Sequence, residues 1–180
     1  MTIFIAGIHG AGKTYLAKPA ADRLGMHYAT ASQLIKEERG RATWGASKEV
    51  SEIDENQVAL IAAVKRIKAT GQALVLDGHF VLFDSAGRIT KIDEGVYRDL
   101  GCEAAVLLTC PPSVALARLA ERDGRAWTVG ELAQLASEEA SQATLICASL
   151  AIPLYELAEP TLETLVATLA AISPRQADAR

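Results

Sequence analysis

Residues 7–14 read GIHGAGKT and match GxxxxGK[ST], the spacing of a phosphate-binding loop. In such a loop the glycines let backbone N–H groups turn inward around phosphate oxygens, the lysine reaches the β- and γ-phosphates, and the next hydroxyl coordinates Mg²⁺. An apolar strand pattern at 2–6 precedes the loop and a helical pattern follows it, so phosphates would lie at a helix N-terminus. The sequence therefore predicts a site for a nucleoside triphosphate, whose binding residues are His9, Gly10, Ala11, Gly12, Lys13, Thr14 and Tyr15.

Length and composition limit the remaining possibilities. With 180 residues, half of them hydrophobic, we expect a single domain over 1–172 and a flexible tail at 173–180. The net charge is −4 and the basic residues are dispersed, which disfavours nucleic acid and anionic membranes as partners. The three cysteines form no C-x-x-C pair, so reduced thiols are expected. The first strand begins too early for a signal peptide and no apolar run is long enough for a membrane span, so we expect a cytoplasmic protein.

Apolar runs and helical patterns alternate along the chain. We expect strands at 2–6, 27–30, 73–77, 104–109 and 152–155, with helices at 13–24, 31–38, 55–70, 113–122, 129–150 and 161–172. This alternation is typical of an α/β fold with a five-stranded parallel sheet. The apolar stripe of 129–150 is interpreted as core. The segments 39–53 and 83–95 are polar and contain glycine, so they are expected to be mobile loops over the site.

A carboxylate follows the third expected strand. Asp77 ends the run ALVLD and precedes Gly78 and His79. In a P-loop sheet this position meets the Mg²⁺ shell, directly or through water, although a strand-end aspartate can also be a cap or turn residue. His79 would orient water or a substrate hydroxyl, or make a structural hydrogen bond instead.

Three arginines follow the fourth expected strand. Arg118 and Arg122 lie one helical turn apart, and Arg125 comes just after Asp123-Gly124. Arginines on a closing segment can neutralise the charge that phosphoryl transfer spreads over the moving group. We therefore interpret 118–128 as a short lid. The alternative is a solvated helix face paired with neighbouring acidic residues.

With these elements in order, the chain resembles the nucleoside-monophosphate kinase group, and most closely the compact archaeal-type adenylate kinases and adenylate-kinase-like ATPases. The resemblance implies a three-layer P-loop kinase fold with a short arginine-bearing lid. It also implies ATP on the P-loop, Arg118 near the adenine, Arg122 on the phosphates and Arg125 as a further lid donor. The segment 31–57 would form the acceptor side, with Ser32, Lys36, Gln57 and His79 as acceptor-binding residues.

The acceptor side departs from the pattern of that group. Lys36 is a point charge where a bidentate arginine is expected, and the two side chains are not interchangeable at a phosphate clamp. The arginine that these kinases carry after the strand-end aspartate is missing from DGHFVLFD. The acceptor pocket is therefore expected to be altered or to serve something other than AMP.

The sequence favours Mg-ATP-dependent phosphoryl transfer to a small molecule, most simply a nucleoside monophosphate. Lys13, Asp77, Arg122 and Arg125 would be the catalytic residues, and Thr14 with Asp77 would bind the metal. Two alternatives stay open. One is a kinase of a non-nucleotide hydroxyl compound, and the other is an ATP-binding switch that hydrolyses ATP slowly and acts on a protein partner.

Overall fold

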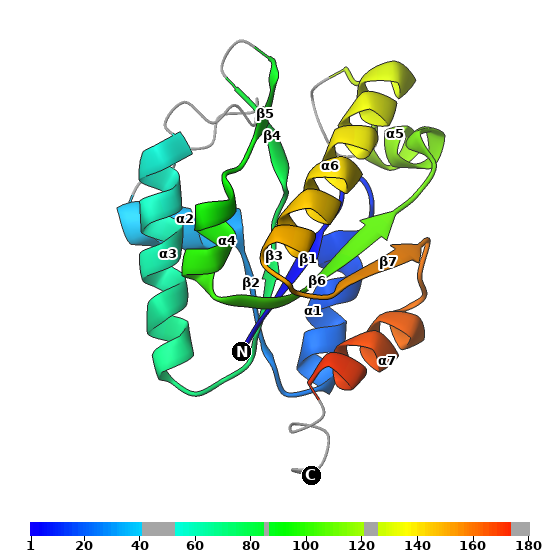
Figure 1. The fold of residues 1–180 in the computed structure, drawn as a ribbon. Coiled ribbons are helices and arrows are strands. Elements are labelled where there is room, and N and C mark those ends of the chain that lie inside the picture. The colour runs from blue at the N-terminus through cyan, green and yellow to red at the C-terminus, as the bar shows by residue number, and fades with distance from the viewer. Residues whose placement is uncertain (41–52, 85–86, 121–125, 174–180) are drawn as a thin grey trace.

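The computed structural model describes residues 1–40, 53–84, 87–120 and 126–173 (Figure 1). Within them a five-stranded parallel sheet has the order β2-β3-β1-β6-β7. Its strands are β1 (Thr2–Ala6), β2 (His27–Thr30), β3 (Leu74–Asp77), β6 (Cys102–Thr109) and β7 (Leu154–Ala158). The helices are α1 (Lys13–Arg23), α2 (Ala31–Arg39), α3 (Ile53–Ala69), α4 (Glu94–Leu100), α5 (Pro112–Ala120), α6 (Val129–Ser149) and α7 (Leu162–Ile172).

Helices cover both faces of the sheet, which explains why the central strands are apolar throughout. Figure 1 shows α1 and α7 on one side and α2, α3 and α4 on the other. Alternate residues of β1 divide between two core clusters, Ile3 and Ile5 in one and Phe4 in the other. The predicted α/β fold with its five-stranded parallel sheet is confirmed.

The long helix α6 belongs to both clusters. Leu135, from its first half, belongs to the cluster of Ile3 and Ile5, whereas Ala143, from its second half, belongs to the cluster of Phe4. Thr128 and Glu131 form a capping box that fixes the start of this helix. The predicted core stripe of α6 is confirmed.

The carboxyl ends of β1 and β3 lie side by side at one edge of the sheet. Ile5 is paired with Asp77, and Thr30 at the end of β2 is paired with Asp77 from the other side. The P-loop leaves β1 at this edge, and residues 78–80 leave β3 there. The sheet thus brings together two segments that are about 70 residues apart in the sequence.

The expectation of a loop over 83–95 was wrong for the residues that the structure describes. A small antiparallel hairpin pairs β4 (Val81–Phe83) with β5 (Ile89–Lys91), and α4 begins at Glu94 with Asp93 as its N-cap. These elements are three to seven residues long, too short to show a clear hydrophobic period. Their stability comes from tertiary contacts, because Phe80, Val81 and Tyr97 are buried in the two cores.

Several element ends also differ from expectation. The last strand begins after Pro153 and continues to Ala158, so the predicted range 152–155 was displaced toward the N-terminus. Pro153 has no N–H for the ladder, and only its carbonyl joins the sheet, accepting from the N–H of Ala105 at 3.0 Å. The described part of α5 ends at Ala120. The predicted lid residues Arg122 and Arg125, most of the segment 39–53 and the tail from 174 lie outside the described residues.

No helix in the described ranges is both long enough and apolar enough to span a membrane. Cys102, Cys110 and Cys147 are free thiols, as expected.

Candidate active site

The P-loop turns tightly between β1 and α1 and rests on the start of α5. Gly12 adopts the left-handed region, with φ of 91°, at the N-cap of α1, so Lys13 opens the helix. Gly10 also has a positive φ, and a Cβ atom there would lie 2.7 Å from the carbonyl oxygen of Ala115. Only glycine permits this close approach, which places the loop against α5.

The side chain of Lys13 folds back over the loop. It is 7% exposed, and its Nζ donates to the carbonyl oxygens of Gly7 and, at 3.2 Å, Ile8. Nζ also lies 3.0 Å from Nε2 of His79. Because an ammonium group carries only donors, Nε2 is the acceptor in this contact. The Lys13 ammonium group, which was predicted to contact the phosphates, is therefore held at the loop beside His79.

Asp77 receives two hydroxyl groups on one oxygen. Thr14 Oγ1 and the phenolic oxygen of Tyr28 each donate to Oδ2 at 3.0 Å. Burial and the nearby Asp77 carboxylate raise the pKa of Tyr28, so it stays protonated and able to donate. Thr14 and Asp77 offer the hard oxygen ligands that Mg²⁺ prefers, and these residues fit a magnesium ion shared with nucleotide phosphates. The described residues contain no cluster of three or more His, Cys, Asp or Glu for a metal held by protein alone.

His79 lies beside His9 of the P-loop, and His9 also contacts an aromatic side chain. Its ring centroid lies 4.6 Å from that of His9, which in turn lies 5.5 Å from that of Trp127. The carbonyl oxygen of His79 accepts from the hydroxyl of Tyr97 at 3.0 Å. Burial, with a smaller contribution from Glu139, raises the pKa of Tyr97 well above its ordinary value. Tyr97 therefore remains a donor that fixes the backbone at His79.

Arg118 reaches the same loop from α5. Its Nη1 donates to the carbonyl oxygen of Gly10 at 3.0 Å, and its side chain lines the cavity beside the P-loop. Tyr15, in the first turn of α1, also lines this cavity with a side chain that is 83% exposed. Arg118 thus lies beside the P-loop, and its place near the adenine, which the family resemblance implied, stays a prediction.

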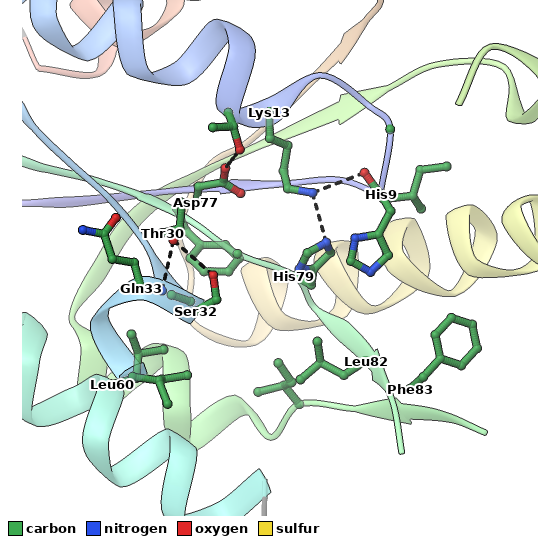
Figure 2. Close-up of a pocket in the computed structure, with 18 of the residues that line it drawn as sticks. His9, Lys13, Thr30, Ser32, Gln33, Leu60, Asp77, His79, Leu82 and Phe83 are labelled. Carbon is green, nitrogen blue, oxygen red and sulfur yellow. Dashed lines mark hydrogen bonds between the residues drawn. The ribbon is translucent and has the colours of Figure 1, made fainter. Parts of the chain in front are cut away.

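One cavity of about 770 Å³ connects the P-loop with the predicted acceptor side. Figure 2 shows Lys13, Asp77 and His79 at one side, with Leu60 and Leu82 facing them across the pocket. Of the predicted site residues, those that line it are His9, Gly10, Gly12, Lys13, Thr14, Tyr15, Ser32, Lys36, Gln57, Asp77, His79 and Arg118. Ala11, within the loop, is buried and is absent from the lining.

The acceptor half of the cavity is largely apolar. Its walls include Ile35, Leu60, Ile92, Val96 and Leu100, from α2, α3, α4 and the segment before α4. Ser32 is exposed at the rim, where its hydroxyl lies 3.1 Å from that of Thr30. Deeper inside, Gln57 is 9% exposed, and its Oε1 has no hydrogen-bond partner within the described part of the chain. Such a buried acceptor is stabilised when a ligand brings a donor.

Three residues at this site were missed in the sequence. Tyr28 and Tyr97 lie in elements that carry no motif, and Glu139 lies in the middle of the α6 core stripe. The pairing of β2 with β3 puts the end of β2 beside Asp77, so strand order would have indicated Tyr28. For Glu139 the only signal was a carboxylate at a helical position otherwise suited to an apolar side chain.

The fold matches those of solved small-molecule kinases. The shikimate kinase from Acinetobacter baumannii, in complex with shikimate, has a TM-score of 0.61 and 15% identity, covering 99% of this chain and 95% of that one. The shikimate kinase from Aquifex aeolicus vf5 has a TM-score of 0.58 and 13% identity, with complete coverage of both chains. A gluconokinase from Sinorhizobium meliloti 1021 has a TM-score of 0.55 and 16% identity, covering 96% and 93%. The chain thus has the fold of these solved kinases, and it carries a P-loop where that fold places one.

Sequence comparison gives one partial match to a relative and one match to a family. A protein of Thermococcus onnurineus (strain NA1) named "Putative adenylate kinase" is 35% identical over 83 residues, which span 46% of this chain and 43% of that protein. The match therefore covers less than half of that relative. A family model described as "AAA domain" matches residues 6–135, and the chain belongs to this family.

Proposed function

We propose that this chain transfers the γ-phosphoryl group of ATP to a small-molecule acceptor, and that the acceptor is a nucleoside monophosphate. The observation that carries the proposal is one continuous cavity, which joins the P-loop to a second half bearing Lys36 and Gln57. A protein that only hydrolyses ATP needs the first half alone. The partial match to the protein named "Putative adenylate kinase" supports the same reading.

In the reaction, an oxygen of the acceptor attacks the γ-phosphorus while the bond to the β–γ bridging oxygen breaks, and ADP leaves. Lys13 would release its carbonyl partners and contact the β- and γ-phosphate oxygens. Thr14 and Asp77 would hold Mg²⁺, which neutralises phosphate charge when bound. Arg122 and Arg125, which lie outside the described residues, are proposed as lid donors to the transferring group.

The acceptor half supplies the specificity. Lys36 would bind an anionic group at the rim, and Oε1 of Gln57 would accept a hydrogen bond from the acceptor inside the pocket. The apolar walls exclude water, which limits wasteful transfer to a water molecule. His79, beside Lys13, would contact the acceptor oxygen.

A non-nucleotide hydroxyl compound is the second candidate. Among the described residues that line the acceptor half, Lys36 is the sole cation, and most of the wall is apolar. One lysine is a weaker clamp for a phosphate dianion than a bidentate arginine. The solved structures with this fold include proteins named shikimate kinase and gluconokinase, which is compatible with this candidate.

A coupled assay of ADP formation tests the proposal. The purified chain is given Mg-ATP alone, then with AMP, GMP, CMP or UMP, and then with a panel of sugar acids and polyols. Stimulation by one monophosphate supports the proposal, whereas stimulation only by a hydroxyl compound supports the second candidate. Constant ADP formation that ignores every acceptor would contradict both and favour an ATP-hydrolysing switch. The Lys13→Ala variant is the control for contaminating ATPases.

A further inference from the structure

A buried carboxylate in α6 bridges the two halves of the phosphate site. Glu139 is 1% exposed, and its Oε1 accepts from the backbone N–H of Gly7 at 3.1 Å. Its Oε2 accepts from the N–H groups of Phe80 and Val81 at 2.9 and 2.8 Å. One side chain thus binds the first residue of the P-loop and the segment that follows His79.

These contacts close a ring around the candidate catalytic groups. Lys13 Nζ donates to the carbonyl oxygen of Gly7 and lies 3.0 Å from His79 Nε2. Gly7 and Phe80, the neighbour of His79, both donate to Glu139. The distance between Lys13 and His79 is therefore fixed in two ways. Their side chains contact each other directly, and the Glu139 carboxylate binds the backbone of both segments.

A carboxylate at this position is costly unless it is compensated. Glu139 lies between Leu135 and Ala143, where α6 passes from one core cluster to the other. Burial raises its pKa, while the charge of Lys13 and the three N–H donors act in the opposite direction. An apolar side chain would avoid the burial cost but would leave three buried N–H groups without their acceptor. The glutamate in this stripe therefore acts as the acceptor for backbone N–H groups of the P-loop and of the segment after His79, and not as a packing residue of the helix.

We propose that Glu139 is a positioning residue that holds the P-loop and the His79 segment at a fixed separation, so that Lys13 and His79 face the same reacting group. Its effect on rate rests on the proposed phosphoryl transfer. Its effect on backbone geometry does not, because the three hydrogen bonds exist whatever the reaction.

The test compares Glu139→Gln and Glu139→Asp with Glu138→Gln. Glu138, the adjacent residue of α6, forms a surface ion pair with Lys91 at 3.1 Å and is the matched control. In Glu139→Gln the shape is kept, but one oxygen becomes an NH₂ group that faces N–H donors. Glu139→Asp keeps the charge, but its side chain is shorter by one methylene, so the carboxylate lies farther from the three N–H donors. Each variant is examined by amide ¹H–¹⁵N NMR, by Mg-ATP binding, and by turnover well below its unfolding temperature.

We expect Glu139→Gln to shift the amide protons of Gly7, Phe80 and Val81 upfield and to lower kcat by about 10- to 100-fold, since displacements near 1 Å cost rates of this order. The Kd for Mg-ATP should change by less than about threefold, because the remaining loop N–H groups still bind the phosphates. Glu139→Asp should retain more of the rate than Glu139→Gln. Glu138→Gln should match the wild type in all three measurements.

Unchanged amide shifts in a folded Glu139→Gln variant would overturn the bridge itself. A kcat equal to that of the wild type, or a loss that only follows the folded fraction, would overturn the positioning role. Should Glu139→Gln fail to fold, the same criteria apply to Glu139→Asp. A wild-type chain that turns over no ATP with any acceptor would instead contradict the proposed function, while the amide shifts and Mg-ATP binding would still decide the bridge.

Discussion

The phenolic hydroxyl of Tyr28 donates to Oδ2 of Asp77 at 3.0 Å, on the same oxygen that accepts from Thr14. Two neighbouring parallel strands, β2 and β3, make this contact possible. The two hydrogen bonds hold the carboxylate in one orientation through this oxygen. Tyr28 therefore acts on the proposed metal site through a residue that would bind the metal.

Tyr28→Phe should raise the Mg²⁺ concentration needed for half-maximal turnover by about tenfold, because partners of metal ligands typically influence affinity to this extent. The measurement is ATP turnover as a function of Mg²⁺ at fixed nucleotide. Tyr155→Phe, on the edge strand β7, is the matched control and should not change it. Equal Mg²⁺ dependence in wild type and Tyr28→Phe would show that Tyr28 does not influence metal binding.

Oε1 of Gln57 has no hydrogen-bond partner among the described residues, and this leads to a prediction in which stability and function move in opposite directions. Gln57→Leu should increase the free energy of unfolding of the ligand-free chain by about 1 kcal/mol, since it removes a buried acceptor without a donor. The same change should raise the KM of the acceptor by about tenfold and leave Mg-ATP binding unaltered. Urea unfolding and acceptor titration measure the two effects. The exposed Gln134→Leu should gain no stability, and a destabilised Gln57→Leu would show that the amide is satisfied in the apo chain.

Alanine variants of Lys13 and Arg122 should distinguish Mg-ATP binding from the rate of phosphoryl transfer. Lys13→Ala should abolish measurable turnover and weaken Mg-ATP binding, because it removes the cation at the P-loop. Arg122→Ala should lower kcat by about 100-fold with little change in Mg-ATP affinity, since a lid donor acts on the transition state. Arg23→Ala, which breaks an exposed pair with Glu163, serves as the arginine control. Equal losses of ATP affinity in Lys13→Ala and Arg122→Ala would exclude the lid assignment.

The stability of the chain should depend on pH through Glu139. Burial raises its pKa in the folded state, so the folded chain holds this proton more tightly than the unfolded one. The resulting stabilisation is present below the ordinary glutamate pKa and is lost as pH rises through the raised value. Glu139→Gln lacks this titration. The stability of Glu139→Gln relative to the wild type should therefore improve as pH rises above the ordinary glutamate pKa.

Urea unfolding at several pH values measures this difference. Lys13 and Tyr97 are ionisable groups that interact with Glu139, so replacing Glu139 changes the electrostatic environment of both. Their ordinary pKa values, about 10, lie well above that of a glutamate, so a difference that develops just above the ordinary glutamate pKa reports Glu139. A constant difference across these pH values would mean that the Glu139 pKa is the same in the folded and unfolded states.

Sequence patterns predicted the sheet because buried parallel strands are short, apolar and separated by helical periods. The P-loop was recognised from its local spacing, and Asp77 from its place at the end of an apolar run. The β4–β5 hairpin and α4 were missed because elements this short owe their stability to the cores that they enter. Glu139 could be seen only once α6 was placed behind the P-loop, since its three donors come from segments 58 to 132 residues away.

The fate of the γ-phosphoryl group tests the central claim most directly. The chain is incubated with Mg²⁺ and ATP labelled at the γ-phosphate, with and without each nucleoside monophosphate, and the labelled products are separated. Our account predicts label in a new diphosphate when the right acceptor is present and little free phosphate without it. Label that accumulates only as free phosphate, at a rate that no monophosphate or hydroxyl compound changes, would contradict phosphoryl transfer to a small molecule.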